Sequence, residues 1–253
     1  MSTAQELIQR VTSHIGASDT GVATVGDAAQ EVTGIAVMSQ ATLQGLQQAA
    51  TAKANLVFSY DPVFWTGGDE INRLETDALF LEKRDFIQAH KMVVVTLRDK
   101  LRDARSDLIA TGMAKALGWQ AENPNLFRRP RTSLLGLTKE LGAKLNDKTM
   151  RVVGDPAIAV ATIATSFGNT SQATGIAALN GPADVLVCGY TREWEVVEYA
   201  QDMLSAGLKK GLVLLGENAS VQPAMAYCAE WIRGFVSEVP VTAIALPEPY
   251  WNP

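Results

Sequence analysis

The sequence predicts an α/β protein made of two related halves, and three observations support this fold class. First, residues 25–36 recur 128 positions later as residues 153–164, with 7 of 12 aligned residues identical. Second, each copy is followed by short apolar runs of the length of a buried strand. Third, helix-like segments alternate with these runs, which favours mostly parallel sheets covered by helices.

The elements follow in order along the chain. Buried strands are expected at residues 54–59, 92–97, 183–188 and 211–215. Segments with polar and apolar faces predict helices at residues 41–53, 77–91, 106–118, 134–145, 193–206 and 223–235. The residues Asn123-Pro124 and Arg128–Arg131 predict a connection between the two halves. We therefore expect a first α/β half over residues 1–122, a linker and helix over 123–150, and a second half over 151–253, with the halves free to form one compact unit.

Composition excludes several function classes. The chain has 253 residues, of which 47% are hydrophobic and 19% charged, an ordinary balance for a folded protein. Its net charge of −5 argues against general nucleic-acid binding, which requires a basic face. No apolar run approaches the roughly 18 residues that a membrane span needs. The N-terminus lacks the pattern of a signal peptide, so we expect a cytoplasmic protein.

Metal-binding and nucleophilic side chains are scarce. The two cysteines, Cys188 and Cys228, cannot form a disulfide framework or a four-thiolate zinc site. The two histidines, His14 and His90, cannot build a multi-histidine site. No Walker motif and no GxGxxG pattern is present, which excludes P-loop and Rossmann cofactor use.

Polar side chains follow the predicted strands, where open α/β sheets bind their ligands. The four strands are followed by Tyr60 and Asp61, by Arg98 and Asp99, by Gly189 and Tyr190, and by Gly216 and Glu217. Carboxylates gathered in a cleft could bind a hard cation such as Mg²⁺ or Mn²⁺. Without a metal, repulsion between them favours protonation of one, which suits a general acid. Alternatively, each residue only caps a strand–helix junction.

Several short motifs recur in an order typical of one family. They are Val25-Gly26-Asp27, Glu31–Ala36, Ala54–Val57, Asp61-Pro62, Phe64-Trp65, Lys83-Arg84, Ala116–Trp119, Arg151–Pro156, Arg192–Glu195, Leu214–Gly216 and Glu248–Pro253. In this order they resemble the Nif-three-like family, also called the dinuclear metal centre hexameric protein or type 2 GTP cyclohydrolase I family. The resemblance covers nearly the whole chain and is closest to the subgroup without an inserted middle domain.

The resemblance implies a fold and a chemistry. Members of this family hold two divalent metals in a pocket between two similar α/β halves, and they often assemble into hexameric toroids. Hydrolase-like reactions on small molecules have been proposed for them. Their ligands are a His-His or His-Glu pair before a proline, an Asp after a later strand, and a C-terminal His with a Glu four residues on.

This sequence departs from that ligand pattern. Tyr60 and Asp61 stand at the first pair, and Asp99 keeps the family's Asp. Glu217 replaces the C-terminal His, and Val221 replaces the Glu that follows it. A two-metal centre of the family type is therefore not expected. The three carboxylates could hold one Mg²⁺ or Mn²⁺, or the site works without metal.

We therefore expect a rebuilt pocket between the halves, with hydrolase-like or acid–base activity on a small polar molecule. The expected catalytic residues are Asp61, Asp99, Glu217, Tyr60 and Tyr190, the last in place of an acidic residue of the subgroup. The expected substrate-binding residues are Arg98, Trp65, Glu193 and Arg192. The alternative is a ring-forming binding or scaffold protein that has lost the metals. In either case the resemblance predicts a homo-oligomer, a hexamer.

Two further segments allow two interpretations each. The glycine-rich residues 67–70 form either a lid over the pocket or a plain surface turn. The basic residues 128–131 either hold an anionic group or belong to a solvated linker.

Overall fold

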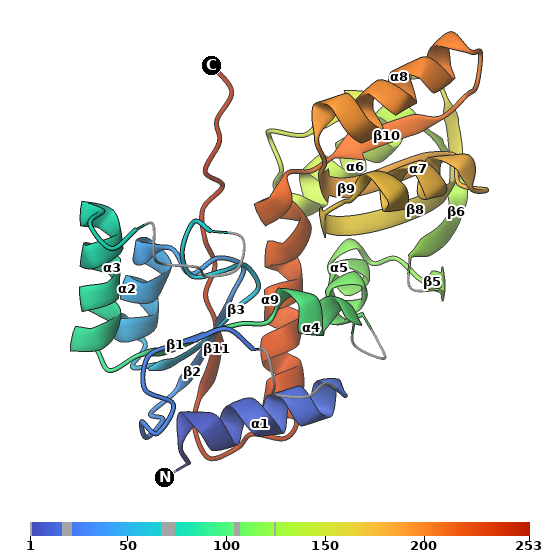
Figure 1. Ribbon diagram of the computed structural model, residues 1–253. Helices are drawn as coiled ribbons and strands as arrows, with labels where there is room; N and C mark the ends of the chain where they lie inside the picture. Colours follow the sequence, from blue (N-terminus) through green and yellow to red (C-terminus); the bar gives the residue numbers. More distant parts are fainter. Residues whose placement is uncertain (1, 17–21, 67–73, 104–106, 124) are drawn as a thin grey trace. The chain divides into compact units, whose positions relative to one another are not determined.

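The computed structural model describes residues 2–16, 22–66, 74–103, 107–123 and 125–253. It confirms the α/β class, with two compact units and two sheets (Figure 1). Unit 1 comprises residues 1–108 and 225–246, and unit 2 comprises residues 109–224 and 247–253. The segment considered as a lid, residues 67–70, lies outside the described residues. Among the described residues, no helix is both long and apolar enough to span a membrane.

The sheet of unit 1 has five strands in the order β1-β4-β3-β2-β11. They are β1 (Thr24–Val25), β2 (Ile35–Met38), β3 (Leu56–Ser59), β4 (Val93–Thr96) and β11 (Val241–Ala243). The strand β1 is antiparallel to β4, and the other neighbours are parallel. The carboxyl ends of β2, β3 and β4 therefore meet at one edge, as the sequence predicts for a ligand site.

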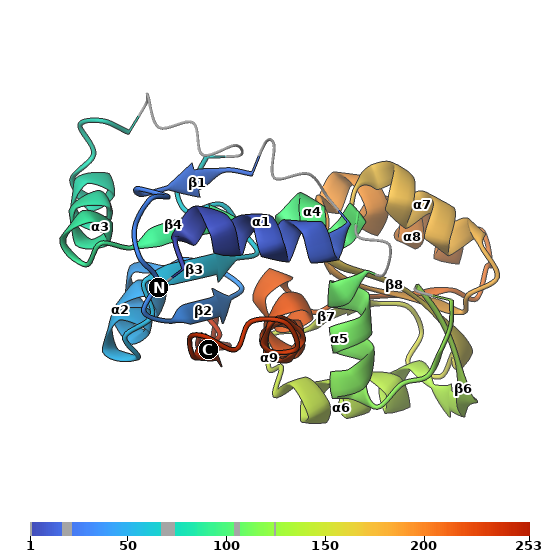
Figure 2. The same cartoon turned by 90° about the horizontal axis from the view of Figure 1, so that it is seen from below.

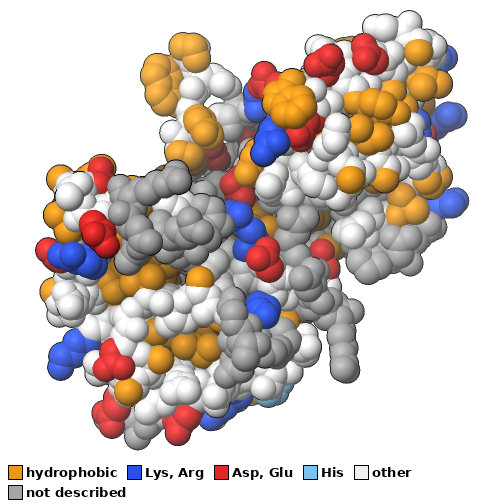
Figure 3. Space-filling view, in the orientation of Figure 1, with side chains coloured by type: hydrophobic (Ala, Val, Ile, Leu, Met, Phe, Trp, Pro, Cys, Tyr) orange, Lys and Arg blue, Asp and Glu red, His pale blue; other side chains and the backbone are white. Residues whose placement is uncertain are grey.

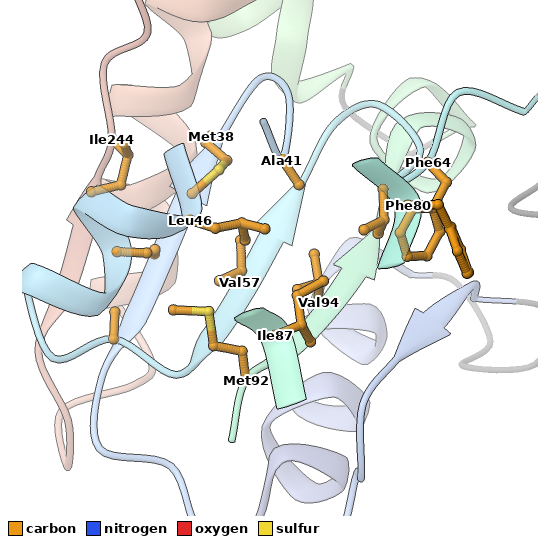
Figure 4. Close-up of a cluster of buried hydrophobic side chains, with 14 residues drawn as sticks. Met38, Ala41, Leu46, Val57, Phe64, Phe80, Ile87, Met92, Val94 and Ile244 are labelled. Carbon is orange, nitrogen blue, oxygen red and sulfur yellow. The ribbon is translucent and has the colours of Figure 1, made fainter. Parts of the chain in front are cut away.

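Helices cover both faces of this sheet. They are α1 (Ala4–Ile15), α2 (Leu43–Thr51), α3 (Ala78–Ala89), α4 (Arg98–Asp103) and the part of α9 (Glu217–Arg233) from residue 225 onward. Met38 and Val57 pack with residues of α2 and α3 in one buried cluster (Figure 4). Their neighbours Val37 and Phe58 face a small pocket that Val11 of α1 and Cys228 of α9 also line, on the face where α1 lies (Figure 2). The alternation follows from the two-residue period of a strand.

The sheet of unit 2 has six strands in the order β5-β6-β8-β9-β10-β7. They are β5 (Ala121–Asn123), β6 (Leu126–Ser133), β7 (Arg151–Val153), β8 (Ala159–Asn169), β9 (Val185–Tyr190) and β10 (Gly211–Leu214). The pairs β8–β9 and β9–β10 are parallel, and the remaining pairs are antiparallel. Both sheets are thus mixed around a parallel centre.

The helices of unit 2 are α5 (Leu108–Leu117), α6 (Leu134–Leu145), α7 (Gln172–Asn180) and α8 (Glu198–Ser205), with a π-helix, η1 (Glu193–Val197), directly before α8. Leu179 of α7, Val196 of η1 and Met203 of α8 share one buried cluster with the strands β8, β9 and β10. Leu134 of α6 instead contacts Gly211 of β10.

The sequence repeat has a structural counterpart in the two sheets. The strand order β1-β4-β3-β2 of unit 1 matches β7-β10-β9-β8 of unit 2. In both, the short first strand is antiparallel to its neighbour and the next two pairings are parallel. The two halves inferred from the repeat thus share one strand topology.

The repeated Gly-Asp dipeptide makes the same turn in both units. Gly26 and Gly154 have positive φ angles of 106° and 134°, a conformation that favours glycine. Asp27 and Asp155 then accept a hydrogen bond at Oδ1 from the amide two residues on, at 3.0 and 2.8 Å. This Asx turn explains why the dipeptide recurs.

Two parts of the expected domain division need correction. Residues 126–133, expected as linker, form the strand β6, which pairs with β8. Arg129 in it forms an ion pair with Glu140 at 2.8 Å and lies 5.1 Å from the ring of Trp119. Residues 225–246, expected in the second half, belong to unit 1 because β11 pairs with β2. Strand pairing between distant segments overrides sequence order in both cases.

Candidate small-molecule site

Two neighbouring parallel strands of unit 1 bring Asp61 and Arg98 together. Ser59 at the end of β3 is paired with Thr96 at the end of β4. The amide of Leu97 donates to the carbonyl of Ser59 at 2.9 Å and extends this pairing beyond the strands. The residues that follow the two strands therefore lie at the same edge of the sheet.

Asp61 is held by several hydrogen bonds. Arg98 donates to its Oδ1 from Nε at 3.0 Å and also from Nη2. Gln40 Nε2 donates to Oδ2 at 3.3 Å. The backbone is fixed as well, because the Asp61 amide donates to Ser39 O at 2.9 Å and Ser59 Oγ donates to Asp61 O at 2.7 Å. Only 7% of Asp61 is exposed, so the carboxylate is a buried, oriented and charge-compensated group.

A cavity of about 490 Å³ opens beside this pair. Its described lining comes from the segment after β2 with the first residue of α2, the segment after β3, the first half of α3 and the start of α4. The volume lies within the range of roughly 300–1,000 Å³ that is usual for small-molecule sites. Charged lining residues are Asp61, Lys83 and Arg98, and apolar ones include Phe64, Trp65 and Leu79.

Lys83 is the unusual member of this lining. It lies on α3 and is only 5% exposed. Its Nζ donates to the carbonyl oxygen of Val63 and lies 5.5 Å from the ring centre of Phe64 and 5.6 Å from that of Trp65. The ammonium group is thus held between a carbonyl oxygen and two aromatic faces, an arrangement that stabilises a cation.

The sequence patterns assign no site role to Lys83 or to Gln40. A usable signal existed for the lysine, since Phe80, Lys83 and Ile87 follow helical spacing and form the buried face of α3. A lysine on an apolar face is rarely buried without a specific environment. Gln40 carries no comparable signal, because it reaches Asp61 only through the folding of the segment after β2.

The other predicted residues of unit 1 lie in different surroundings. Trp65 lines the cavity and is 61% exposed. Tyr60 is buried in the core, with its ring 5.7 Å from the guanidinium of Arg98, and does not belong to the cavity lining. Asp99 is exposed in the first turn of α4. Of the five residues predicted in this unit, the structure therefore places Asp61, Arg98 and Trp65 on one cavity.

Tyr190 and Glu217 lie at the carboxyl edge of the sheet of unit 2. Tyr190 is the last residue of β9 and pairs with Asn169 of β8. Glu217 is the first residue of α9, and Ser220 Oγ donates to its backbone carbonyl at 2.8 Å. Both side chains are half-buried. Both residues therefore lie where strands of the sheet of unit 2 end, as the sequence predicts.

Arg192 and Glu193 lie at the start of the π-helix in unit 2. Both are exposed, and each forms an ion pair with a nearby side chain. Arg192 pairs with Glu195 at 3.1 Å, and Glu193 pairs with Arg151. The guanidinium of Arg192 also lies 5.9 Å from the ring of Trp194. Surface ion pairs of this kind contribute little to stability.

The comparisons with known proteins now settle the family. The family model described as Duf34/NIF3 (NGG1p interacting factor 3) matches residues 8–208. This chain belongs to the Duf34/NIF3 family. The match confirms the family resemblance inferred from the motifs. No curated protein matches the chain.

Three solved structures illustrate that the fold is shared over nearly the whole chain. Protein SA1388 of Staphylococcus aureus has a TM-score of 0.79 at 16% identity, with 99% of each chain covered. A Bacillus cereus protein related to NIF3 has a TM-score of 0.80 at 13% identity, also with 99% of each chain covered. Protein ybgI, described as of unknown function, has a TM-score of 0.76 at 20% identity, covering 98% of this chain and 100% of its own.

Asp61, which stands where the resemblance places a metal ligand, has a cationic partner in this structure. Within the described ranges, no group of three or more His, Cys, Asp or Glu side chains is placed to hold a metal. Asp61 stands at the second position of the first ligand pair and is already paired with the guanidinium of Arg98. A cation at about 4 Å from a guanidinium is repelled by about 4 kcal/mol per unit charge at an effective dielectric constant of about 20.

The histidines and cysteines also lie in structural positions. His90 ends α3, where its Nδ1 lies 3.0 Å from the Phe86 carbonyl oxygen. His14 stacks on Phe235 with ring centres 3.8 Å apart. Burial raises the pKa of the Cys188 thiol to about 12. Such a thiol is a poor nucleophile at neutral pH.

Proposed function

We propose that this Duf34/NIF3 protein is a hydrolase-like or acid–base enzyme that takes a small polar molecule into the cavity of unit 1. The observation that carries the proposal is the buried carboxylate of Asp61, which lines this cavity and is oriented by Arg98. A carboxylate that is fixed in orientation and borders a cavity is within reach of a bound molecule, which is the first requirement of a general base.

The two oxygens of Asp61 have different surroundings. Both contacts from Arg98 go to Oδ1, whereas Oδ2 receives the longer 3.3 Å contact from Gln40. We assign Oδ2 as the base: it accepts a proton from water while the water oxygen attacks the substrate. The proton then passes to the leaving group, so that one water is consumed and the carboxylate is restored. Arg98 acts through Asp61 as a positioning residue.

The sequence also proposes Asp99, Glu217, Tyr60 and Tyr190 as catalytic residues, and Arg192 and Glu193 as substrate contacts. None of these six residues is among the described lining of the cavity. Trp65 has a more direct basis as a substrate contact, because its ring borders the same cavity as Asp61.

We propose that this chemistry runs without the two metals of the family. The ion pair between Arg98 and Asp61 supports a metal-free reaction, because the guanidinium supplies the positive charge that a metal ion would otherwise provide beside the carboxylate. The other form of the proposal is an enzyme that uses one hard cation, Mg²⁺ or Mn²⁺. Metal analysis of untagged protein by plasma mass spectrometry distinguishes the metal-free enzyme from the enzyme with one cation. Only the enzyme with one cation contains Mg²⁺ or Mn²⁺ in stoichiometric amount.

The second candidate function is binding without catalysis. It is favoured by the finding that Asp61 is the only carboxylate among the described lining residues of the cavity. Enzymes that use carboxylate pairs need a second such group close by. In this form the protein is a binding or scaffold subunit that has lost the metals.

One experiment tests the proposal against this second candidate. A library of small polar molecules is screened by thermal shift, and each hit is then tested for turnover with wild-type protein, Asp61→Asn and Asp85→Asn. Asp85 is a matched control because it also pairs with an arginine but is exposed. We expect Asp61→Asn to lower turnover by roughly 10²–10⁴-fold and Asp85→Asn to leave it unchanged. Binding without turnover would favour the scaffold, and a screen without hits would contradict both.

Assembly, partners and location remain predictions from the resemblance and composition: a homo-oligomer, specifically a hexamer, in the cytoplasm, without nucleic-acid or membrane partners. Acidic and basic side chains are interspersed over the described residues visible in Figure 3, in line with a net charge of −5. Size-exclusion chromatography with light scattering measures the oligomer. A monomer at micromolar concentration would contradict the expected assembly.

A further inference from the structure

We propose that Gln40 determines which molecules the cavity of unit 1 accepts, by forming with Asp61 a pair of hydrogen-bond acceptors that selects ligands with a planar NH2 group. Such a group occurs in primary amides, ureas and amidines. This inference rests on the proposed function in one respect, because it takes Oδ2 of Asp61 as the oxygen that faces the ligand. It adds the chemical group that lies beside that oxygen.

Gln40 is placed beside Asp61 by the pairing of two parallel strands. Met38 at the end of β2 is paired with Ser59 at the end of β3. The pairing continues beyond the strands, because the Asp61 amide donates to Ser39 O at 2.9 Å. Gln40 is the next residue along this segment, and it lines the same cavity as Asp61. The two side chains therefore start from neighbouring backbone positions at one edge of the sheet.

The side-chain amide of Gln40 has only one orientation that fits Asp61. Nε2 of Gln40 donates to Oδ2 of Asp61 at 3.3 Å. A carboxylate that is paired with a guanidinium only accepts hydrogen bonds, so the NH2 side of the amide must face it. No residue that the structure describes donates to the other end of the amide, Oε1. Because Gln40 lines the cavity, Oε1 is an acceptor that remains for a ligand.

Oδ2 of Asp61 also has acceptor capacity left. An ionised carboxylate has about four acceptor positions, two on each oxygen. Arg98 fills two positions at Oδ1, from Nε and Nη2, whereas Gln40 fills one position at Oδ2. Within the part of the chain that the structure describes, Asp61 has no further side-chain donor. One position at Oδ2 therefore remains, beside Oε1 of Gln40.

The spacing of these two oxygens suits one NH2 group. Within an amide group, the oxygen and the nitrogen are about 2.3 Å apart, so Oε1 of Gln40 and Oδ2 of Asp61 are at most about 5.6 Å apart. A planar NH2 group directs its two hydrogens about 120° apart, and at about 2.9 Å from each acceptor it bridges oxygens about 5 Å apart. A methyl group in the same place donates to neither oxygen and leaves both unpaired, which weakens binding. The acceptor pair therefore discriminates NH2 from CH3.

The proposed reaction agrees with this class of ligand. In that reaction Oδ2 of Asp61 accepts a proton from water and passes it to the leaving group. For a primary amide, the carbon gains the hydroxyl of the water, the C–N bond breaks, and the nitrogen leaves as ammonia with the proton from Oδ2. An NH2 group bound at Oδ2 is placed to receive that proton.

The test compares three probes that share a benzene ring, which suits the apolar residues Phe64, Trp65 and Leu79 of the lining. Benzamide carries a neutral NH2 group, benzamidine presents the group in a cation, and acetophenone has a methyl group where benzamide has NH2. Binding to the full-length protein is measured by NMR titration. Gln40→Met removes both ends of the amide and keeps the length of the side chain. Gln44→Met is the matched control, because Gln44 is exposed on α2 and lies outside the described lining.

We expect wild-type protein to bind benzamide roughly tenfold more tightly than acetophenone, because the methyl group forfeits two hydrogen bonds. Gln40→Met should reduce this preference to about threefold or less, and Gln44→Met should keep it within about twofold. Benzamidine should also bind more tightly than acetophenone, and its order relative to benzamide distinguishes an amidine from an amide as the source of the NH2 group. If Gln40→Met does not fold, Gln40→Asn moves the acceptor away on a shorter side chain and should reduce the preference likewise.

Equal affinity of wild-type protein for benzamide and acetophenone would overturn the inference, and so would a preference that the Gln40 variants leave unchanged. A wild-type protein that binds none of the three probes would overturn it as well. The proposed function fails separately, when Asp61→Asn turns over a substrate like wild-type protein. A substrate that is turned over without an NH2 group would remove this inference and leave the enzyme. A preference for benzamide together with failed turnover would leave this inference standing and remove the enzyme.

Discussion

Arg98 donates to Oδ1 of Asp61 from Nε at 3.0 Å, although 36 residues separate them along the chain. The ion pair joins the ends of two neighbouring parallel strands, β3 and β4. In the family that this chain resembles, the position of Asp61 belongs to a metal ligand. Here a protein cation stands beside it. The repeated half offers no equivalent pair, because Tyr190 at the end of β9 and Gly216 after β10 stand at the corresponding positions.

The first prediction concerns the stability that this pair contributes. Arg98→Met leaves a buried carboxylate without its counter-charge, so we expect the free energy of unfolding to fall by about 3 kcal/mol. The double variant Asp61→Asn with Arg98→Met should lose less than the sum of the single variants. Urea denaturation measures all three. Arg84→Met breaks the exposed pair with Asp85 and should cost less than about 1 kcal/mol; an equal cost at both arginines would contradict the buried pair.

The second prediction concerns the turn repeated in both units. A Cβ on Gly26 would lie 2.2 Å from the carbonyl oxygen of Met92, at a φ of +106°. Gly26→Ala therefore combines backbone strain with a steric clash, and we expect a loss of about 2–4 kcal/mol in urea unfolding. Gly207 is the control, because its φ of +84° is also positive but nothing lies within 4 Å of its added Cβ. A Gly207→Ala variant as unstable as Gly26→Ala would show that the clash is irrelevant.

The third prediction concerns the two cysteines. Burial raises the pKa of both Cys188 and Cys228 to about 12 from an ordinary value of 9.0. The unfolded chain loses these protons first, so the thiols' contribution to stability is complete below about pH 9 and is lost as the pH rises toward 12.

Labelling with a disulfide reagent checks the cysteine prediction. At pH 8 we expect no fast reaction in native protein and two reactive thiols per chain in denaturant. The double variant in which both cysteines become alanine should lose less stability than wild type between pH 8 and pH 10. Rapid labelling of native protein would contradict the burial of the thiols.

The fourth prediction concerns an ion pair between the N-terminal helix and the segment after α9. A hydrogen bond from its own amide, together with Arg10 and Ser2, lowers the pKa of Glu238 to about 2. Arg10 Nη1 lies 2.6 Å from Glu238 Oε1. A lowered pKa means that the stabilisation is present above about pH 4.5 and is lost as the pH falls toward 2.

In Glu238→Gln, the free energy of unfolding should fall less than in wild type between about pH 4.5 and about pH 2, as measured by circular dichroism. The effect should stay below about 1 kcal/mol, because both side chains are one-third exposed. Glu82→Gln on the exposed face of α3 is the control and should follow the wild-type curve. Identical acid curves for wild type and Glu238→Gln would contradict the prediction.

Local patterns were enough to predict much of this protein. The α6 helix has the expected bounds, residues 134–145, because its apolar residues follow helical spacing and Ser133 caps it. The repeat of Val25-Gly26-Asp27 predicted two related sheets, since a Gly-Asp turn has a local cause. The placement of Asp61 and Arg98 at one sheet edge followed from the rule that parallel strands end together.

Other features depended on contacts between distant segments. The sequence predicts a linker where β6 lies, because arginines interrupt the alternation of buried and exposed residues that is typical of a strand. Only Phe127 is fully buried, and the strand forms by pairing with β8. The return of residues 225–246 to unit 1 is decided by the pairing of β11 with β2. The π-helix η1 likewise has no local signal strong enough to predict it. The spacing of Phe80, Lys83 and Ile87 marks Lys83 as buried, but its position beside Trp65 depends on tertiary contacts.

The sequence by itself determined the class of fold, the internal repeat and the chemical types available at the strand ends, because these depend on local periodicity and on residue identity. Only the tertiary structure decided that Arg98 neutralises Asp61 and that Lys83 enters the same cavity. The physical reason is that charge pairing and burial depend on distances between side chains far apart in the chain, which no local pattern encodes.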